Sequence, residues 1–154
     1  QWQPDANGRP LVRVNGGKFR NVGIEAEYGR RLSDRLKWNV SGSYSNPRQK
    51  EMNETYWKQA APKLQFTTGI RYESPTWEAG TSFSFVTKRL RNRDGGLNPN
   101  IALWNAYVGY HFNKDATLRL DARNLLDRHN VITNGDYEYW GDPFTYELSY
   151  TQKF

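Results

Sequence analysis

The sequence predicts an all-β protein whose antiparallel strands form part of a β-barrel that crosses a membrane. Apolar and polar residues alternate along seven stretches of about ten residues. Short turns and long polar loops alternate strictly between these stretches. Aromatic residues make up 15% of the 154 residues although only 36% are hydrophobic. A barrel wall explains this combination, because only every second strand residue faces lipid.

Composition argues against several other classes of protein. The mean hydropathy of −0.94 is very polar, but a disordered chain of that polarity would lack the aromatic residues. No apolar run reaches ten residues, so neither a transmembrane helix nor a signal peptide is predicted. The absence of cysteine fits an oxidising compartment. The net charge of +6 does not predict a nucleic-acid partner, because the basic residues form no stripe on one element.

The seven predicted strands each place large apolar side chains on one face. The last of them puts Phe144, Tyr146, Leu148, Tyr150 and Phe154 on the same side. Short turns are expected at residues 33–35, 74–76 and 113–115, and long loops at residues 47–62, 89–100 and 128–143. The strands are expected at about Arg20–Leu32, Leu36–Asn46, Lys63–Glu73, Trp77–Lys88, Ile101–Phe112, Ala116–Asp127 and Phe144–Phe154.

An odd number of strands leaves the closure of the barrel open. In outer-membrane barrels the short turns are periplasmic and the long loops extracellular, so the last strand is expected to end in the periplasm. Either residues 9–15, with the short piece Leu11–Val14, supply an eighth strand, or the chain is the C-terminal part of a larger barrel. The first option corresponds to a complete small barrel with a structural or adhesive role. A soluble β-protein that binds a ligand inside is a further alternative.

Two groups of residues resemble one family. The stretch Asn124–Asp127, the loop segment Tyr139–Pro143 and the strand ending at Phe154 resemble the C-terminal end of TonB-dependent outer-membrane receptors. Asn21–Glu27 looks like a strand of the same family with the pattern Asn-x-Gly-Val-Glu-x-Glu. Leu126, Phe144 and Gln152 depart from the family's usual residues.

This resemblance implies an organisation and a function. Residues 1–18 would be an extracellular loop or strand remnant, and residues 19–154 the C-terminal segment of a barrel of 22 strands. The protein would be a transporter rather than an enzyme, without a cofactor, in the bacterial outer membrane. Its cargo would be a ferric siderophore or a similar scarce metal chelate. Its partners would be outer-membrane lipid, lipopolysaccharide and the TonB complex, reached through a plug region that these residues do not contain. Phe154 would be the assembly signal.

No catalytic or metal site is predicted. His111 is expected to line the polar face of its strand, and His129 lacks a partner motif. Glu25 and Glu27 are expected to form ion pairs along the polar face, with neighbouring strands offering Lys37, Arg71 and Arg119. Asp127 is expected to belong to a turn at a strand end.

The long loops carry the candidate ligand-binding residues. Arginine forks suit anionic ligands, and exposed aromatic rings can stack on a flat ligand. Contact with lipopolysaccharide, packing between loops and simple solvation are the alternatives. The candidates are Tyr56, Trp57, Arg89, Arg91, Arg93, Tyr137, Tyr139 and Trp140.

Overall fold

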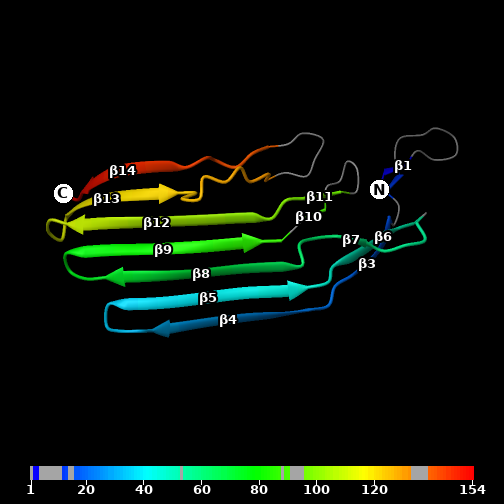
Figure 1. Ribbon diagram of the computed structural model, residues 1–154, viewed down its shortest axis with the longest axis horizontal. Coiled ribbons are helices and arrows are strands. Elements are labelled where there is room, and N and C mark those ends of the chain that lie inside the picture. Colours follow the sequence, from blue (N-terminus) through cyan, green and yellow to red (C-terminus); the bar gives the residue numbers. More distant parts are fainter. Residues whose placement is uncertain are drawn as a thin grey trace.

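A meander of seven antiparallel strands forms the body of the protein (Figure 1). The computed structural model describes residues 2–3, 12–13, 16–52, 54–87, 89–90, 96–132 and 139–154. Each strand pairs with the next one along the chain, in the order β14-β13-β12-β9-β8-β5-β4. The strands are β4 (Gly23–Arg31), β5 (Leu36–Ser45), β8 (Leu64–Glu73), β9 (Trp77–Val86), β12 (Ile101–His111), β13 (Ala116–Arg123) and β14 (Thr145–Gln152).

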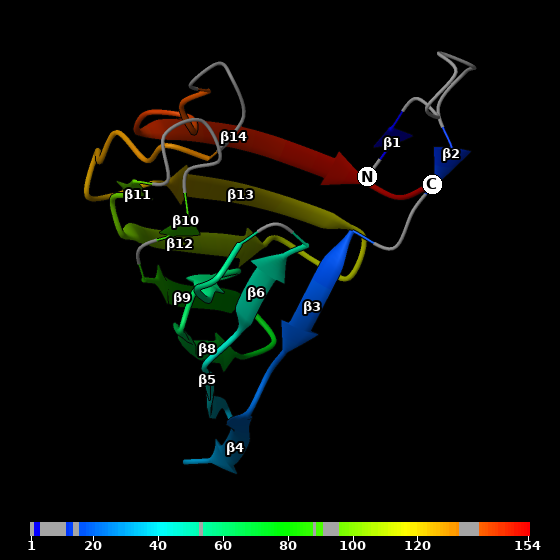
Figure 2. The same ribbon diagram turned by 90° about the vertical axis from the view of Figure 1, so that its right-hand side faces the viewer.

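The long connections contain short strands of their own, beyond the outer end of the seven-stranded sheet. Figure 2 shows β3 and β6 diverging from the row of wall strands. One three-stranded sheet joins β3 (Gly17–Arg20), β6 (Arg48–Glu51) and β7 (Lys58–Gln59). Two-residue pairs join β10 (Arg89–Leu90) to β11 (Leu97–Asn98), and β1 (Trp2–Gln3) to β2 (Val12–Arg13).

The prediction of one continuous strand at Arg20–Leu32 is wrong, because the strand is interrupted between β3 and β4. The ladder of β4 with β5 ends at Gly23 opposite Ser45, and the ladder of β3 with β6 begins at Arg20 opposite Arg48. The shared register places Pro47 opposite Asn21. The N–H that proline lacks would point toward β7, where Ala60 N–H donates to the Pro47 carbonyl, and not toward Asn21. The ring acts here by fixing φ near about −65°, away from the extended strand conformation.

Two further expectations about strand limits need correction. The sixth predicted strand ends at Arg123 rather than at Asp127, because Asn124 adopts a left-handed backbone with φ of 51°. Val12–Arg13, the described part of residues 9–15, does not add an eighth strand, since it pairs with Trp2–Gln3 and not with the seven-stranded sheet. Within the described residues, β4 and β14 are therefore the two edges of that sheet.

Cross-strand register places the predicted apolar side chains on one face of the sheet. Val108 lies opposite Leu120 on one side and Ala79 on the other, and Leu120 lies opposite Leu148. Large side chains on the inner strands of this face remain partly exposed, with Ile70 and Trp104 at 43% and Val108 at 39%. A contiguous exposed apolar surface of this kind is unusual for a soluble monomer and marks a face that contacts lipid or another apolar partner.

Polar atoms on the apolar face are satisfied by the same arrangement at two places. The indole N–H of Trp38 donates to Thr68 Oγ1 at 2.9 Å, and the Thr68 hydroxyl donates to the backbone carbonyl of Asn39 at 2.9 Å. Trp104 repeats this arrangement on Thr81, whose hydroxyl donates to the backbone of the next strand. Both pairs present ring carbon to the outside while their polar atoms remain paired, as a lipid-facing surface requires.

Candidate functional site on the polar face and the outer loops

Arg119 is the centre of a charged cluster on the polar face of the sheet. Its guanidinium donates to Glu78 Oε1 at 2.9 Å and to both carboxylate oxygens of Asp121 at 2.7 and 2.8 Å. It also lies 3.8 Å from the centre of the Tyr107 ring. Three strands contribute to the cluster, so these contacts hold β9, β12 and β13 in one register.

Glycine at position 80 makes room for this cluster. A Cβ atom at Gly80 would lie 2.5 Å from the ring of Tyr107, which is closer than real Cβ atoms approach. The ring therefore lies over the bare backbone of β9, where it also contacts Arg119. An aromatic ring that covers a glycine on the neighbouring strand helps to fix strand register.

The expected ion pairs of Glu25 and Glu27 are wrong. Arg71 and Lys37 instead reach Glu73, at 2.6 and 3.4 Å, while Arg119 reaches Glu78 and Asp121. None of the ion pairs in the described part of the chain includes Glu25 or Glu27. Both residues lie on edge strand β4, opposite Ser43 and Ser41, so their nearest cross-strand neighbours are uncharged.

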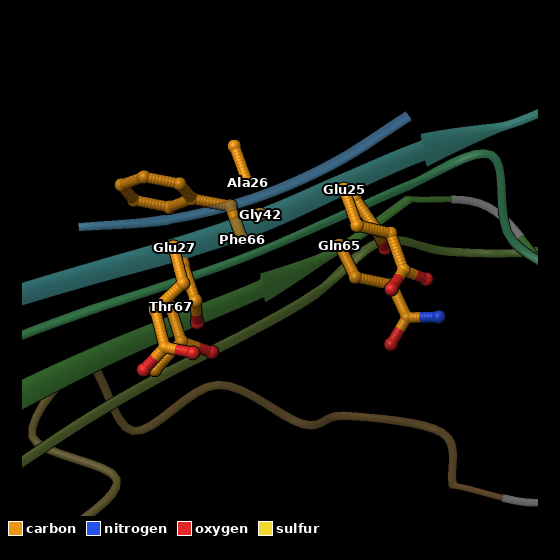
Figure 3. A pocket seen from close by; sticks show the side chains of 9 residues that line it. Glu25, Ala26, Glu27, Gly42, Gln65, Phe66 and Thr67 are labelled. Carbon is orange, nitrogen blue, oxygen red and sulfur yellow. The ribbon is translucent and has the colours of Figure 1, made fainter. Parts of the chain in front are cut away.

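A shallow polar hollow of about 490 Å³ lies beside these two carboxylates. Figure 3 shows Glu25, Glu27, Gln65 and Thr67 projecting from one side of the sheet, with Phe66 on the other. The hollow therefore belongs to the polar face at the edge of the sheet. In the described residues, no group of three or more His, Asp or Glu could hold a metal ion.

His111 lies on the polar face, as its position in the strand predicts. Its Nδ1 is 2.9 Å from the Thr117 hydroxyl, directly across the β12–β13 ladder. His129 instead lies in the third long loop, with its ring edge-on to Trp140 at 5.8 Å. The two histidines are thus separate and serve different contacts.

The first outer loop places two candidate aromatic residues beside cations. Trp57 lies under the guanidinium of Arg20 at 4.5 Å, and the more exposed Tyr56 ring lies 5.4 Å from Lys58 Nζ. Lys58 also forms an ion pair with Glu54. Their hydrogen bond holds the pKa of the Glu54 carboxyl below its usual value and the pKa of Lys58 above its own.

Arg89 connects the second outer loop to the third. Its guanidinium donates to the backbone carbonyl of Ile132 at 3.0 Å and to that of Val131. Val131 in turn forms a β-bridge with Trp140. The structure therefore brings the candidates Arg89 and Trp140 into one group, in which Arg89 contacts backbone carbonyls.

Tyr139 and Trp140 are the most accessible candidates of the third loop, with 62% and 55% of their surface exposed. Both rings are therefore open to a ligand outside the seven-stranded sheet. Three further candidates, Arg91, Arg93 and Tyr137, lie outside the described residues.

Asparagine side chains fix the base of the third loop. Asn124 is 1% exposed, and its amide donates to the carbonyls of Arg128 and Asp142, both at 3.0 Å. The amide of Asn130 both accepts from and donates to the backbone of Ala102, at 3.2 Å each. The side-chain amide of Asn130 thus makes the two hydrogen bonds to Ala102 of β12 that the backbone of a paired strand would make.

The stretch Asn124–Asp127 forms a turn, as expected for Asp127. Asp127 has a φ of 45°, and its Oδ1 accepts from the backbone N–H of Phe144 at 2.8 Å. The turn therefore holds the start of β14 beside the end of β13. Phe154, the predicted assembly signal, is fully exposed at the end of the chain.

Solved structures that are similar to this fold include two transporters and an import receptor. The ferric citrate transporter FecA, in its unliganded form, superposes with a TM-score of 0.77 and 22% identity, covering 98% of this chain and 26% of that one. The ferric-catecholate import receptor Fiu from E. coli K12, in its closed form, superposes with a TM-score of 0.69 and 20% identity. The match covers 100% of this chain and 23% of that one. The copper transporter OprC superposes with a TM-score of 0.68 and 17% identity. The match covers 99% of this chain and 26% of that one.

A family model described as "TonB dependent receptor-like, beta-barrel" matches residues 1–125. The chain belongs to this family of TonB-dependent receptor barrels. It spans about a quarter of the length of the solved structures that it matches. The seven-stranded sheet is accordingly part of a larger barrel. No curated protein sequence matches the chain, and no helix among the described residues is long and apolar enough to cross a membrane.

Within this receptor barrel segment, sequence reasoning missed the residues that position the loops. Arg20, which covers Trp57, lies in the sequence at the start of a predicted strand, far from the loop that it contacts. Asn130 lies in a loop without a recognised motif, although buried asparagines that replace strand pairing are common at loop bases. The two asparagines at positions 124 and 130 are the signal that the sequence offers.

Proposed function

We propose that this chain forms part of the wall and outer loops of a receptor that imports a ferric siderophore or a similar metal chelate across the bacterial outer membrane. The observation that carries the proposal is the two-faced sheet. Its apolar face has satisfied polar atoms, and its polar face carries the Arg119 cluster. Membership of the TonB-dependent receptor family supports this assignment.

The similar structures support the class of cargo. Their names specify ferric citrate, ferric catecholate and copper, which are scarce metals or metal complexes. Many such chelates are anionic and carry flat ring systems, for which arginine forks and exposed aromatic rings are suitable partners. We assign the contacts to exposed aromatic loop residues, chiefly Tyr56, Tyr139 and Trp140, with Trp57 beneath Arg20.

Energy for the transport step would come from the TonB complex of the inner membrane. In this proposal the sheet is a rigid wall, and the moving part is a plug region held against its polar face. The carboxylates of Glu25 and Glu27 lie beside the polar hollow, where they could contact such a plug. In this orientation the periplasmic ends of the strands lie at the short turns, where β13 begins and β14 ends.

Uptake of radioactive iron tests the proposal directly. Cells that express the native protein, and cells from which it has been deleted, would be offered ⁵⁵Fe as ferric citrate or as ferric catecholates. We expect at least one chelate to enter only when the protein is present and the inner membrane is energised, with uptake abolished by a protonophore. Equal uptake by both strains for every chelate, including a copper chelate, would contradict the proposed cargo class.

A further inference from the structure

Four cations form a compact block on the outermost part of the first hairpin. The ladder between β3 and β6 places Lys18 opposite Lys50 and Arg20 opposite Arg48. Directly opposed residues on paired strands point to the same side, with Cβ atoms about 5 Å apart. Positions 18 and 20 on one strand and positions 48 and 50 on the other also share that side, because the side-chain period is two.

Such an arrangement is unfavourable by itself, since like charges directly opposite each other on paired strands repel. The acidic residues nearby lie elsewhere, since Glu51 is on the opposite face of β6 from its neighbour Lys50. The ion pair of Glu54 is with Lys58, and Lys58 lies opposite Gln49, which is on the other face of β6. In the described part of the chain, none of the ion pairs includes any of the four cations. Arg48 donates to Asn46 and Arg20 lies over Trp57, and neither contact supplies a negative charge.

The position of the block along the hairpin indicates what neutralises it. The two ladders share one register, so the face of the four cations continues the apolar face of β4 and β5. Moving outward along this face, Ala26 opposite Gly42 is followed by Ile24 opposite Tyr44, then by Val22 beside Asn46, and then by the two cationic pairs. Figure 1 shows β3 and β6 beyond the outer ends of β4 and β5.

This order matches the layers of a membrane surface. Aliphatic residues meet hydrocarbon, a tyrosine marks the headgroup level, and lysine and arginine just beyond it meet anionic groups of the headgroups. Tyr44 is 55% exposed and Ile24 is 70% exposed, so both side chains are available to lipid. Arg48 lies four residues beyond Tyr44, which is about 13 Å along a strand.

We infer that Lys18, Arg20, Arg48 and Lys50 form a binding site for the phosphate groups of outer-leaflet lipopolysaccharide. Two arginine forks and two ammonium groups supply more positive charge than one phosphate requires, which suits a headgroup with two phosphates. This inference rests on the outer-membrane orientation given under the proposed function, but it is independent of the cargo.

Binding of purified lipid A to the intact native protein in detergent tests the site. The double variant Lys18→Gln with Lys50→Gln would be compared with Lys114→Gln with Lys153→Gln, which removes the same charges at the opposite end of the strands. We expect the first pair to weaken binding of diphosphorylated lipid A by roughly tenfold to thirtyfold. The second pair should leave it unchanged, and replacing all four cations by glutamine should remove binding.

Two further measurements distinguish lipid phosphates from an anionic ferric chelate as the ligand of this site. Dephosphorylated lipid A should bind the native protein and the Lys18/Lys50 variant equally, since only the phosphates contact the site. Equal binding of diphosphorylated lipid A by both double variants, with the sheet content retained by circular dichroism, would overturn the inference. The inference would also be overturned if the Lys18/Lys50 variant bound lipid A normally but lost affinity for a soluble ferric chelate, because the four cations would then bind the cargo. An unsuccessful uptake experiment would leave the lipid-binding difference intact.

Discussion

Replacing Val108 by lysine should prevent the protein from assembling in the outer membrane. Val108 lies on the apolar face, between Leu120 and Ala79, and 39% of its surface is exposed. A lysine there would place an ammonium group against hydrocarbon. The cost is about 2–4 kcal/mol at the bilayer midplane, which is a large fraction of the stability of most proteins. The amount of the Val108→Lys variant in isolated outer membranes, compared with the amount of the native protein, measures the effect.

Two matched variants separate charge from the loss of a side chain. Val108→Ala removes the same contacts without adding charge, and it should still assemble. Ser41→Lys adds the same charge on the polar face, where Ser41 lies opposite Glu27 and Thr67, and it should also assemble. If Ser41→Lys and Val108→Lys were equally defective, the assignment of the two faces would be wrong.

Replacing Asn124 by alanine should release the base of the third outer loop. The side chain of Asn124 accepts one hydrogen bond and donates two, and the residue is almost completely buried. Its loss leaves the carbonyl of Asp142 and the N–H of Arg128 without this partner, whereas the carbonyl of Arg128 keeps Asn130 at 3.3 Å. Each group left unsatisfied costs up to about 1–3 kcal/mol. Alanine also disfavours the left-handed backbone at this position. We expect a local destabilisation of about 3 kcal/mol or more.

Amide hydrogen exchange measures this local effect residue by residue. The N–H groups of Arg128 and Phe144 are held by Asn124 and Asp127, so their protection should fall by about two orders of magnitude. Asn124→Gly, which tolerates the backbone angle, should lose less stability than the alanine variant. Leu126→Ala in the same turn removes a side chain that is 42% exposed and should have little effect. Unchanged protection in Asn124→Ala would contradict the assigned role.

Alternation of side chains made the wall predictable from sequence. The period of two in stretches such as Phe144–Phe154 identifies both faces without any knowledge of pairing. The alternation of short and long connections then orders the strands as a meander, which the register confirms. Gln152 was unexplained by that pattern. It accepts a hydrogen bond from Tyr150 at 2.8 Å and donates to the carbonyl of Lys153, so its amide is satisfied at the strand end.

Features that depend on which residues lie opposite each other could not be predicted in the same way. The break between β3 and β4 lies where Pro47 of the partner strand is opposite Asn21, a pairing that becomes visible only when the register is known. The ion pairs of Glu25 and Glu27 were misassigned because charge alone does not reveal that β4 is an edge strand next to serines. Register, rather than composition, decides both cases.

The loop contacts were inaccessible to sequence reasoning for another reason. Arg89 donates to backbone carbonyls of residues more than forty positions away, and every residue offers such carbonyls. An arginine-rich loop therefore has the same appearance in sequence whether its guanidinium groups face a ligand or another loop. The roles of Tyr139 and Trp140 in ligand binding stay predictions.

A scan of lipid accessibility along β12 tests the central claim that one face of this sheet lies against the membrane. Since these 154 residues contain no cysteine, single cysteines at positions 102 to 110 can carry spin labels in the native protein reconstituted in lipid. Labels at positions 104, 106, 108 and 110, on the face of Val108, should be accessible to oxygen dissolved in lipid, whereas a label at position 102 should be shielded, because Ala102 is buried beside Asn130. Labels at the odd positions, on the face of Tyr107, should be shielded from it. Equal accessibility at all positions, or the opposite phase, would contradict the account.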